Sequence, residues 1–595
     1  MPPQALLALA IAAAAAPSLL AWSVSPSPTF LNQALALGLW GLFVAAAAAG
    51  APARAPRRGT PVLALHAALA LVALGVVWSW GPGVLPAGLA LSALGLLAAA
   101  ALLAQAGAAA RATAAAQPLL LIFCVAWVGA GLLNAAIGAV QVFAPELADG
   151  DWIARSNLPG RAVGNLRQPN HVSSLLLWSA IALVALVGIG RSGTEGRFGP
   201  LGRLGRIDHR LGAALLALLV FTLVLTASRT GIVGVALLAL WGLLDRRLTR
   251  PQRARLLAAP LVYALAWAGL AAWAQLGAQR FGGAERLAEG DLSASRFGIW
   301  ANTLALIRDQ PWTGVGFGEF NFAWSLTPFP DRPTAFFDHA HNLPLHLAVE
   351  LGLPLATGVL GLLGLALWQG WRRSAGDTGA RCAWLMVLMI GLHSLLEYPL
   401  WYAYFLLPAA WAWGYALGRP EPAPTAPAAR VSPADDFAPL PQPATAQLVG
   451  GLVLALAAGL SVADYRSVAA IFSAPADAPP LARRIAAGQD SWLFAHHADY
   501  AAATSGRPPP PEDRAFAGAT HYLLDTRMLS AWLRSLAAAG RPDEARHLAA
   551  RLREFERKGP PSEVFAPCAD PASAPLTLQC APPVRTPGWR DFLAR

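Results

Sequence analysis

The sequence is short of charged residues. Only 13% of its 595 residues are Asp, Glu, Lys or Arg, about half of the ~25% that is typical of soluble globular domains. Hydrophobic residues make up 56%, and they are gathered in runs of roughly 20, the length that crosses a bilayer as a helix. The scarcity of charge therefore excludes a soluble globular protein and predicts an all-α, polytopic membrane protein.

Cysteine is also scarce, and its positions exclude a zinc site. Two of the four cysteines, Cys124 and Cys382, lie in apolar runs, where a free thiol packs as a small hydrophobe. Cys568 and Cys580 lie in the polar tail, close enough in sequence to form a disulfide in an oxidising compartment. No Cys/His spacing fits zinc, and no Asp-rich motif suits a divalent ion. We therefore expect no metal and no cofactor.

The net charge of +11 does not indicate nucleic-acid binding. The arginines form no basic stripe with interleaved aromatic residues, but fall in short loops that alternate onto one side of the apolar runs. They are Arg54, Arg57, Arg58, Arg111, Arg191, Arg197, Arg203, Arg206, Arg246, Arg247, Arg250, Arg253, Arg255, Arg372 and Arg373. By the positive-inside rule this side is cytoplasmic, which places the tail outside. We therefore expect a bacterial inner-membrane protein whose surroundings are the lipid bilayer.

About thirteen apolar segments are predicted to be membrane spans. They are residues 5–24, 30–50, 61–80, 85–106, 118–143, 171–190, 211–228, 230–244, 256–278, 344–369, 382–398, 400–417 and 446–463. Their boundaries are softest near Ser228 and Pro399, where the turns are tight. The first run lacks a charged n-region, which favours a retained helix over a signal peptide, although its Ala-rich stretch leaves cleavage open.

The spans and loops predict five regions. They are residues 1–160 (N-terminal transmembrane helices), 161–417 (a transmembrane core with a periplasmic loop at 279–343), 418–445 (a cytoplasmic Pro/Ala-rich linker), 446–463 (the last span) and 464–595 (a small helical periplasmic domain). Within the last region, two stretches with helical spacing flank a turn at Gly540. They predict a plain helical pair rather than a tetratricopeptide unit.

Four polar clusters adjoin the hydrocarbon on the periplasmic side, where polar side chains are costly. They are residues 161–171, 226–231, 280–350 and 393–404. Plainer interpretations exist for three of them: a helix cap at Asn170, an interfacial Arg229 that reaches for water, and an aromatic belt around Tyr402. An arginine in a short outer turn nevertheless runs against the positive-inside bias, which makes a bound phosphate at least as good an interpretation of Arg229.

The segment His339-Ala-His-Asn342 lies at the mouth of a predicted helix whose first turn suits Pro344. His346 and Glu350 then lie one turn apart on one face below it. The glycine-rich run at 314–318 follows no strand and opens no helix, which excludes a nucleotide-binding loop. Three histidines and a carboxylate at a helix mouth favour chemistry over a structural role.

Together these residues resemble the O-antigen ligase/polymerase superfamily of bacterial membrane glycosyltransferases. The motifs that carry the resemblance are Ser228-Arg-Thr-Gly231, Arg296-x-x-Ile-Trp300, Pro311-x-x-Gly-x-Gly316 and His341-Asn-x-x-Leu345 with Glu350-x-Gly352. Within that superfamily, Gly164-Asn-Leu-Arg-Gln-Pro-Asn-His171 and Glu397-Tyr-Pro-Leu-Trp-Tyr402 are similar to the protein O-oligosaccharyltransferase branch, the PglL type that glycosylates pilins. The informative motifs cover about residues 160–405.

The resemblance implies a GT-C-like membrane fold and transfer of a glycan from undecaprenyl diphosphate to a Ser or Thr hydroxyl of a periplasmic protein such as a pilin. His341 is then the candidate base that removes the proton of the hydroxyl. Arginines would stabilise the diphosphate leaving group without a metal. These arginines are Arg229 and Arg296, with catalytic roles, and Arg167 and Arg280, with donor-binding roles. The other substrate-binding candidates are Gln168, Asn170, His339, Asn342, Glu397 and Tyr398.

Two alternatives stay open. An O-antigen ligase with a lipid A core acceptor, or an O-antigen polymerase, keeps the reaction and changes the acceptor. The Gln168-Pro-Asn170 and Glu397-Tyr-Pro399 motifs and the long tail argue against it. A transporter or flippase would place its polar site near the bilayer midplane on broken helices of paired repeats, whereas the polar clusters here lie at the outer ends of spans and no repeat is found.

Overall fold

The structure of the chain is a computed structural model that describes most of its residues. The described residues are 3–50, 61–81, 84–113, 115–189, 207–277, 280–288, 292–420, 442–557, 563–569, 577–585 and 587–593. Across these ranges the regular secondary structure is helical, apart from one isolated bridge between Val24 and Ser27. The predicted cytoplasmic arginines at 54–58 and 191–206, and most of the predicted linker, lie outside them. The all-α prediction is confirmed.

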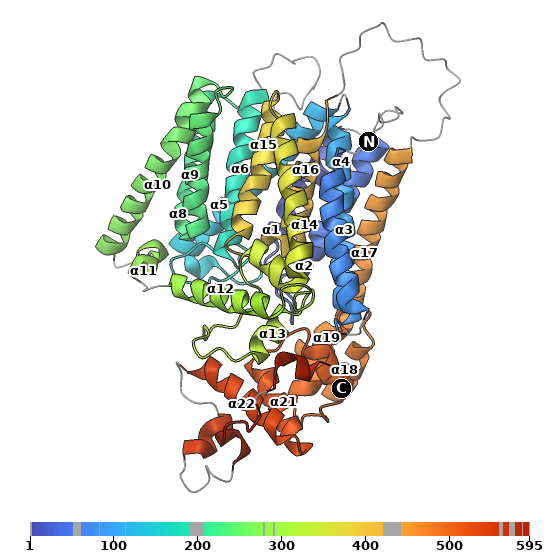
Figure 1. Ribbon diagram of the computed structural model, residues 1–595. Helices are drawn as coiled ribbons and strands as arrows, with labels where there is room; N and C mark the ends of the chain where they lie inside the picture. The colour runs from blue at the N-terminus through green and yellow to red at the C-terminus, as the bar shows by residue number, and fades with distance from the viewer. Residues whose placement is uncertain are drawn as a thin grey trace.

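The apolar segments form a bundle of helices, drawn upright in Figure 1. In chain order they are α1 (Pro3–Leu19), α2 (Phe30–Ala49), α3 (Leu63–Trp80), α4 (Ala87–Arg111), α5 (Ala116–Phe143), α6 (Pro169–Ile189), α8 (His209–Thr226), α9 (Arg229–Leu244), α10 (Arg250–Gly277), α14 (Leu343–Arg373), α15 (Thr378–Ser394), α16 (Ala403–Leu417) and α17 (Gln442–Phe472). Each predicted span coincides with one of these helices, although α17 extends well past the predicted end at residue 463.

The predicted number of thirteen spans is not confirmed. Among the described residues, nine helices are long and apolar enough to cross a membrane. The remaining helices α1, α9, α15 and α16 have 17, 16, 17 and 15 residues, fewer than the ~20 that a full crossing takes. Three of them are cut short by polar segments, because α9 begins at the capping Ser228, α15 ends shortly before Glu397 and α16 begins after Tyr402. The chain is a multi-pass membrane protein.

Helix α6 lies at the centre of the bundle. It is buried along almost its whole length and packs against α5, α8 and α15. Elsewhere small residues bring helices together: a Cβ atom at Gly414 in α16 would lie 1.8 Å from the carbonyl oxygen of Ala104 in α4. Such close backbone approach is a usual way for helices to pack inside a membrane. A polar residue at the start of α6 therefore lies on a helix that is packed on several sides.

Short helices and the C-terminal domain cover one end of the bundle, which we call the site face (Figure 1). The segment between α10 and α14 contains α11 (Gly282–Ala288), α12 (Leu292–Asp309) and α13 (Phe320–Leu326), and α12 runs across the ends of the bundle helices. The C-terminal domain follows with α18 (Leu481–Gln489), α19 (Ala495–Thr504), α20 (Arg514–Ala519), α21 (Thr526–Ala538) and α22 (Pro542–Glu556). Helices α21 and α22 are the predicted pair.

A kink in α14 accommodates the glycine-rich run. Gly352 has a φ of 75° inside the helix, a left-handed conformation that glycine adopts without strain. The run packs against this kink, where Val315 donates a backbone hydrogen bond to Val349 (2.8 Å) and Gly316 donates one to Glu350 (3.0 Å). The glycines therefore let the segment lie directly on the α14 backbone, next to the helix mouth that carries His341.

The C-terminal domain shares a hydrophobic core with the segment between α10 and α14, which we call the outer loop. Trp324 and Phe337 of the loop belong to the same cluster of buried side chains as Leu529 and Phe555 of α21 and α22. Cys568 and Cys580 form a disulfide beyond α22, a pairing that their spacing in the sequence allowed. The loop and the tail, which are far apart in the sequence, are thus packed as one body on the site face.

Candidate functional site

The buried carboxylate of Glu397 joins residues from four separate segments. Its Oε1 accepts hydrogen bonds from the guanidinium of Arg296 and, at 3.0 Å, from the side-chain amide of Asn170. Its Oε2 lies 2.7 Å from Nδ1 of His341. Asn170 in turn accepts a hydrogen bond from the Ser228 hydroxyl at 2.6 Å. We call these five residues the Glu397 cluster.

The backbone explains why these side chains meet. Asn170 lies in the first turn of α6, where Gln168 Oε1 accepts from its backbone N–H at 3.0 Å. Ser228 caps α9 by accepting from the Gly231 N–H at 3.2 Å, directly after Ala227 ends α8 in a left-handed conformation. Side chains of capping residues and first-turn residues project at the helix ends. The polar ends of α6 and α9 therefore face the same point.

His341 reaches the cluster through an unusual backbone conformation. Its φ is 51°, in the left-handed region that few non-glycine residues adopt. Asn342 then caps α14 by accepting from Leu345 N–H at 3.1 Å, while its amide donates to the carbonyl of Leu395 at 3.1 Å. This second bond ties the start of α14 to the end of α15. Strained conformations of this kind persist where the surroundings hold them, often at functional sites.

The contact with Glu397 fixes how the imidazole of His341 works. A carboxylate only accepts hydrogen bonds, so in the neutral ring Nδ1 carries the hydrogen and Nε2 keeps its lone pair. Within the described part of the chain, Nε2 of His341 has no hydrogen-bond partner. A carboxylate behind a histidine orients the ring and stabilises the imidazolium that forms when Nε2 takes a proton. The pair is therefore arranged as a general base.

Glu397 is ionised in spite of its burial. Burial by itself would raise the pKa of this carboxyl, whose side chain is 8% exposed, but the hydrogen bond and charge of His341 and the charge of Arg296 outweigh burial and lower the pKa to about 2. The pKa of Asp338, whose side chain is 47% exposed, is also lowered to about 2, because the charge of His339 and its hydrogen bond outweigh desolvation. Both carboxylates therefore carry a negative charge at neutral pH.

Acid is expected to destabilise this region in a defined window. The pKa of Glu397 is lower in the folded chain than its ordinary value of 4.5, so its contribution to stability is full above pH 4.5 and is lost as the pH falls towards 2. The shift in pKa corresponds to about 3 kcal/mol of folding free energy. Hydrogen exchange of residues 394–402 in the purified chain should accelerate between pH 4.5 and 2.5, after correction for the intrinsic rate.

The variant Glu397→Gln should lose most of this pH dependence, because an amide does not titrate. Glu512→Gln is a matched control, since Glu512 lies exposed in an ion pair with Arg541 on the C-terminal domain. An unchanged slope in Glu397→Gln, with the same acceleration as in Glu512→Gln, would show that another group causes the acid effect.

A layer of rings lies beside the cluster. His339 stacks on Tyr398 with ring centroids 4.2 Å apart and planes 9° apart, and His339 Nδ1 lies 3.0 Å from a carboxylate oxygen of Asp338. Below them, His346 Nε2 lies 3.4 Å from Glu350, one helical turn further along α14, as the sequence spacing predicted. Flat aromatic surfaces of this kind suit the binding of a sugar ring, which keeps His339 and Tyr398 as predicted substrate contacts.

The predicted arginines divide into two groups. Arg296 is bonded to Glu397 and to the Leu396 carbonyl, and Arg167 donates to the carbonyls of Ala21 and Asn165, so both are engaged within the protein. Arg229 and Arg280 are exposed, and neither has a side-chain partner among the described residues. Arg229 and Arg280 are the arginines that are free to meet an anionic ligand. Arg167, with a φ of 57°, instead holds the loop before α6.

Two features of the site were missed by sequence reasoning. Ser228 was quoted as part of a motif, yet its bond to Asn170 is what connects α9 to the cluster. Asp338 was given no role, although it is the partner of the His339 ring. The cap pattern Ser-x-x-Gly and the Asp-His pair were the available signals. No group of three His, Cys, Asp or Glu side chains suited to a metal occurs in the described ranges.

Three family models match the chain, and together they include every residue of the Glu397 cluster. The "O-Antigen ligase" model matches residues 214–360, the "Protein glycosylation ligase" model matches 162–187, and the "Virulence factor membrane-bound polymerase, C-terminal" model matches 382–558. The last range extends through the C-terminal domain as far as α22.

Curated relatives match over parts of their length. A general O-oligosaccharyltransferase of Acinetobacter baylyi is 38% identical over 120 residues, which is 20% of this chain and 21% of the relative. A ComP-specific O-oligosaccharyltransferase of the same species is 25% identical over 273 residues, 45% and 46% of the two chains. The matches thus span less than half of these relatives. With the three family models, they show that segments of this chain are similar to membrane glycan ligases of the O-antigen ligase and protein glycosylation ligase families.

Proposed function

We propose that this chain is a protein O-oligosaccharyltransferase, which moves a glycan from undecaprenyl diphosphate to a Ser or Thr hydroxyl of a periplasmic protein such as a pilin. The observation that carries the proposal is the Glu397–His341 pair, a histidine with a free Nε2 held by a buried carboxylate on the site face. The names of the two Acinetobacter relatives support the protein acceptor.

The proposed step needs one base and one stabilised leaving group. His341 Nε2 takes the proton of the acceptor hydroxyl as its oxygen attacks the anomeric carbon of the glycan. The bond between that carbon and the diphosphate oxygen breaks, and the electron pair leaves with the lipid diphosphate. Arg229 and Arg280, exposed and free, neutralise the charge that grows there. Arg296 fixes Glu397 and adds positive charge at the same place.

The orientation supports a periplasmic reaction. The site face carries the outer loop and the C-terminal domain with its disulfide, and disulfides persist in the periplasm and not in the cytosol. Arginines of the opposite end, such as Arg111 and Arg373, are part of the loops that the positive-inside rule assigns to the cytoplasm. The proposed substrates are therefore a lipid in the outer leaflet of the inner membrane and a secreted protein.

An O-antigen ligase or polymerase is the second candidate. The "O-Antigen ligase" model matches the segment with Ser228, Arg296 and His341, and the polymerase model matches the segment with Glu397. Both candidates share the donor and the base, and they differ in whether the acceptor hydroxyl belongs to a protein, to lipid A core or to another glycan.

The acceptor is tested by expressing the full chain in bacteria that make a lipid-linked glycan, together with a pilin and a complete lipid A core. We expect the intact mass of the pilin to rise by the mass of the glycan, and the lipopolysaccharide to stay unmodified. Glycan on lipid A core, or longer glycan polymers, with an unmodified pilin would replace the proposed acceptor with that of the second candidate. A chain carrying His341→Gln is the background control.

A further inference from the structure

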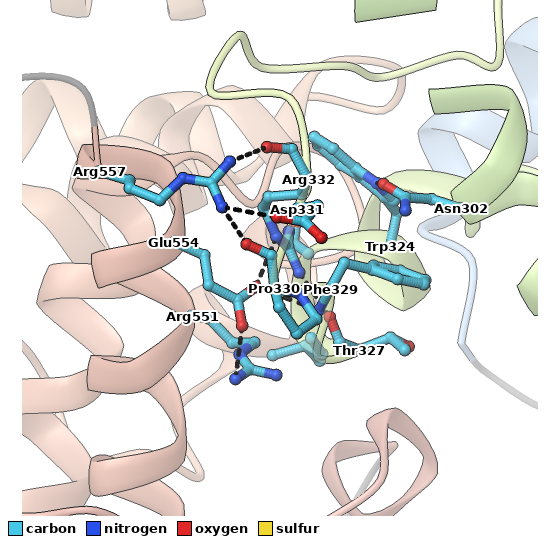
Figure 2. Close-up of polar contacts among 12 residues, drawn as sticks. Asn302, Trp324, Thr327, Phe329, Pro330, Asp331, Arg332, Arg551, Glu554 and Arg557 are labelled. Atoms are coloured by element: carbon cyan, nitrogen blue, oxygen red, sulfur yellow. Dashed lines mark hydrogen bonds and ion pairs between the residues drawn. The ribbon is translucent and has the colours of Figure 1, made fainter. Parts of the chain in front are cut away.

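Arg332 lies at the contact between the outer loop and the C-terminal domain, and its side chain is completely buried (0% exposed). Figure 2 shows its guanidinium pointing to Glu554 of α22, whose carboxylate accepts its Nε–H at 2.7 Å. The same carboxylate accepts from the backbone of Phe329 at 3.2 Å, and Arg551 holds its other oxygen at 2.8 Å. Glu554 of the C-terminal domain therefore accepts two hydrogen bonds from the turn of the outer loop at residues 329–332.

Aromatic rings surround the charge of Arg332. Its central carbon lies 4.6 Å from the ring centroid of Phe555 and 5.0 Å from that of Trp324. Burial is the largest effect on its pKa and lowers it to about 10, although Glu554 opposes this shift, so the guanidinium stays charged at neutral pH. Within the described residues Nη1 has no hydrogen-bond partner. A buried charge in this position depends on its carboxylate and on cation–π contacts.

Trp324 connects this contact to the Glu397 cluster by two routes. Its ring packs edge-on against Phe337 (5.9 Å between centroids), and Phe337 packs edge-on against the ring of His341 (5.2 Å). Its Nε1 donates to the side chain of Asn302 at 3.1 Å, on the helix α12 that also carries Arg296. Trp324 thus contacts both parts of the outer loop that bond Glu397. These parts are the segment with Phe337 and His341, and α12 with Arg296.

We infer that Arg332 is a positioning residue for the transfer reaction, and that Glu554 of the C-terminal domain acts through it to hold His341 and Arg296 in register with Glu397. The C-terminal domain is then a working part of the active site. The expected effect on the rate of glycan transfer rests on the proposed function. The expected loosening of the His341 segment rests on the structure alone.

Neutralising Glu554 should loosen the contact around Arg332. An amide in its place keeps the shape of the side chain and leaves the buried guanidinium without a counter-charge, so the contact should open to admit water. The rings of Trp324 and Phe337 then lose their fixed neighbour, and His341 moves relative to Glu397. Displacements of about 1 Å in a catalytic group lower rates by as much as ~10²-fold.

A second buried contact stabilises the same docking and makes the test possible. His521, just before α21, lies 2.6 Å from Glu319 at the start of α13, and the backbone of Leu524 donates to Asn321 at 2.8 Å. Because these bonds are separate from Arg332, the C-terminal domain should stay attached when Glu554 is changed. The variant is therefore expected to fold, with the Arg332 contact loosened and the domain in place.

The experiment compares the full-length wild type with Glu554→Gln and with the matched control Glu512→Gln, an exposed ion-pair residue of the same domain. Hydrogen exchange of residues 336–345 is measured without substrate, and glycan transfer is measured over a range of acceptor concentrations. In Glu554→Gln we expect exchange at 336–345 to accelerate at least ~5-fold, and kcat to fall ~10-fold with a change in the acceptor KM below ~2-fold. Glu512→Gln should behave as wild type, and Glu554→Asp should recover part of the loss.

Each outcome decides the matter. Unchanged exchange at 336–345, or faster exchange in α22 that does not extend to 336–345, would overturn the inference, as would a change in KM with an unchanged kcat. If Glu554→Gln fails to fold, Arg557→Gln replaces it, because Arg557 bonds the same turn from the exposed side, at Pro330 and Asp331, and a smaller change in the same direction is required. If Glu554→Gln accelerates exchange at 336–345 but the wild-type chain itself transfers no glycan, the mechanical inference stands and the proposed function fails.

Discussion

His341→Gln is expected to lower glycan transfer by ~10²–10⁴-fold, the range that a positioned general base contributes. Glutamine retains a polar group of similar size that is able to donate to Glu397, so the buried carboxylate keeps a partner and the site stays folded. It has no lone pair basic enough to take the proton of a hydroxyl. The effect should therefore fall on kcat, with little change in the affinity for the lipid-linked donor.

Two histidine variants separate catalysis from folding in this test. His339→Gln changes the same residue type two positions away, where the ring contacts Asp338 and Tyr398, and it should cost less than ~10-fold. His66→Gln lies in α3 and should leave transfer unchanged, because the His66 ring bonds only the carbonyl of Ala101 in the described structure. A His341→Gln chain that keeps more than a tenth of wild-type kcat would eliminate His341 as the base.

The second large effect is expected for Glu397→Gln, again ~10²–10⁴-fold in kcat. The amide has one oxygen and one NH₂ group, while Arg296 and Asn170 both donate to the position of Oε1. The oxygen must stay there, so the NH₂ faces His341 Nδ1 and forces that nitrogen to accept. Nε2 then carries the hydrogen and is unable to act as a base, which is the tautomer effect known for histidine–carboxylate pairs.

The tautomer explanation has its own measurement. In the ¹⁵N spectrum of His341-labelled chain, the protonated ring nitrogen of the neutral form should be Nδ1 in the wild type and Nε2 in Glu397→Gln. Glu397→Asp, which keeps the charge on a shorter side chain, should retain the wild-type tautomer and part of the activity. A fully active Glu397→Gln, or an unchanged tautomer with lost activity, would mean that Glu397 does not orient His341.

The helices and the helix mouth at Asn342 were within reach of sequence reasoning, because apolar runs and capping patterns depend on residues close in the chain. The lengths of three helices were not, because α9 begins directly after Ser228, α15 ends shortly before Glu397 and α16 begins after Tyr402, so that polar residues beside the site bound each of them. The sequence shows that Ser228 and Glu397 are polar, but it does not show at which residue the neighbouring helix begins or ends.

Contacts between residues far apart in the chain limited how much of the site could be predicted from the sequence. Glu397 bonds partners that are 56, 101 and 227 residues away in the sequence, so its role as the shared acceptor depends on how the bundle folds. Arg167 and Arg229 both lie in short polar motifs next to apolar runs, and the sequence does not distinguish them. In the structure Arg167 donates to the carbonyl of Ala21, whereas Arg229 is exposed. Arg332 reads as an ordinary loop arginine and is completely buried. Tertiary packing decides each of these cases.

We propose that His341, oriented by Glu397, acts as the base in glycan transfer from a lipid diphosphate to a protein hydroxyl. The most direct test of this role uses the purified full chain in liposomes with undecaprenyl-diphosphate-linked glycan and a purified pilin. The amounts of glycosylated pilin and of released undecaprenyl diphosphate are measured in the same sample. We predict that the two products appear in equal amounts and that His341→Gln reduces both together by at least ~10²-fold. Lipid diphosphate released with no glycosylated pilin, or equal yields from wild type and His341→Gln, would contradict the account.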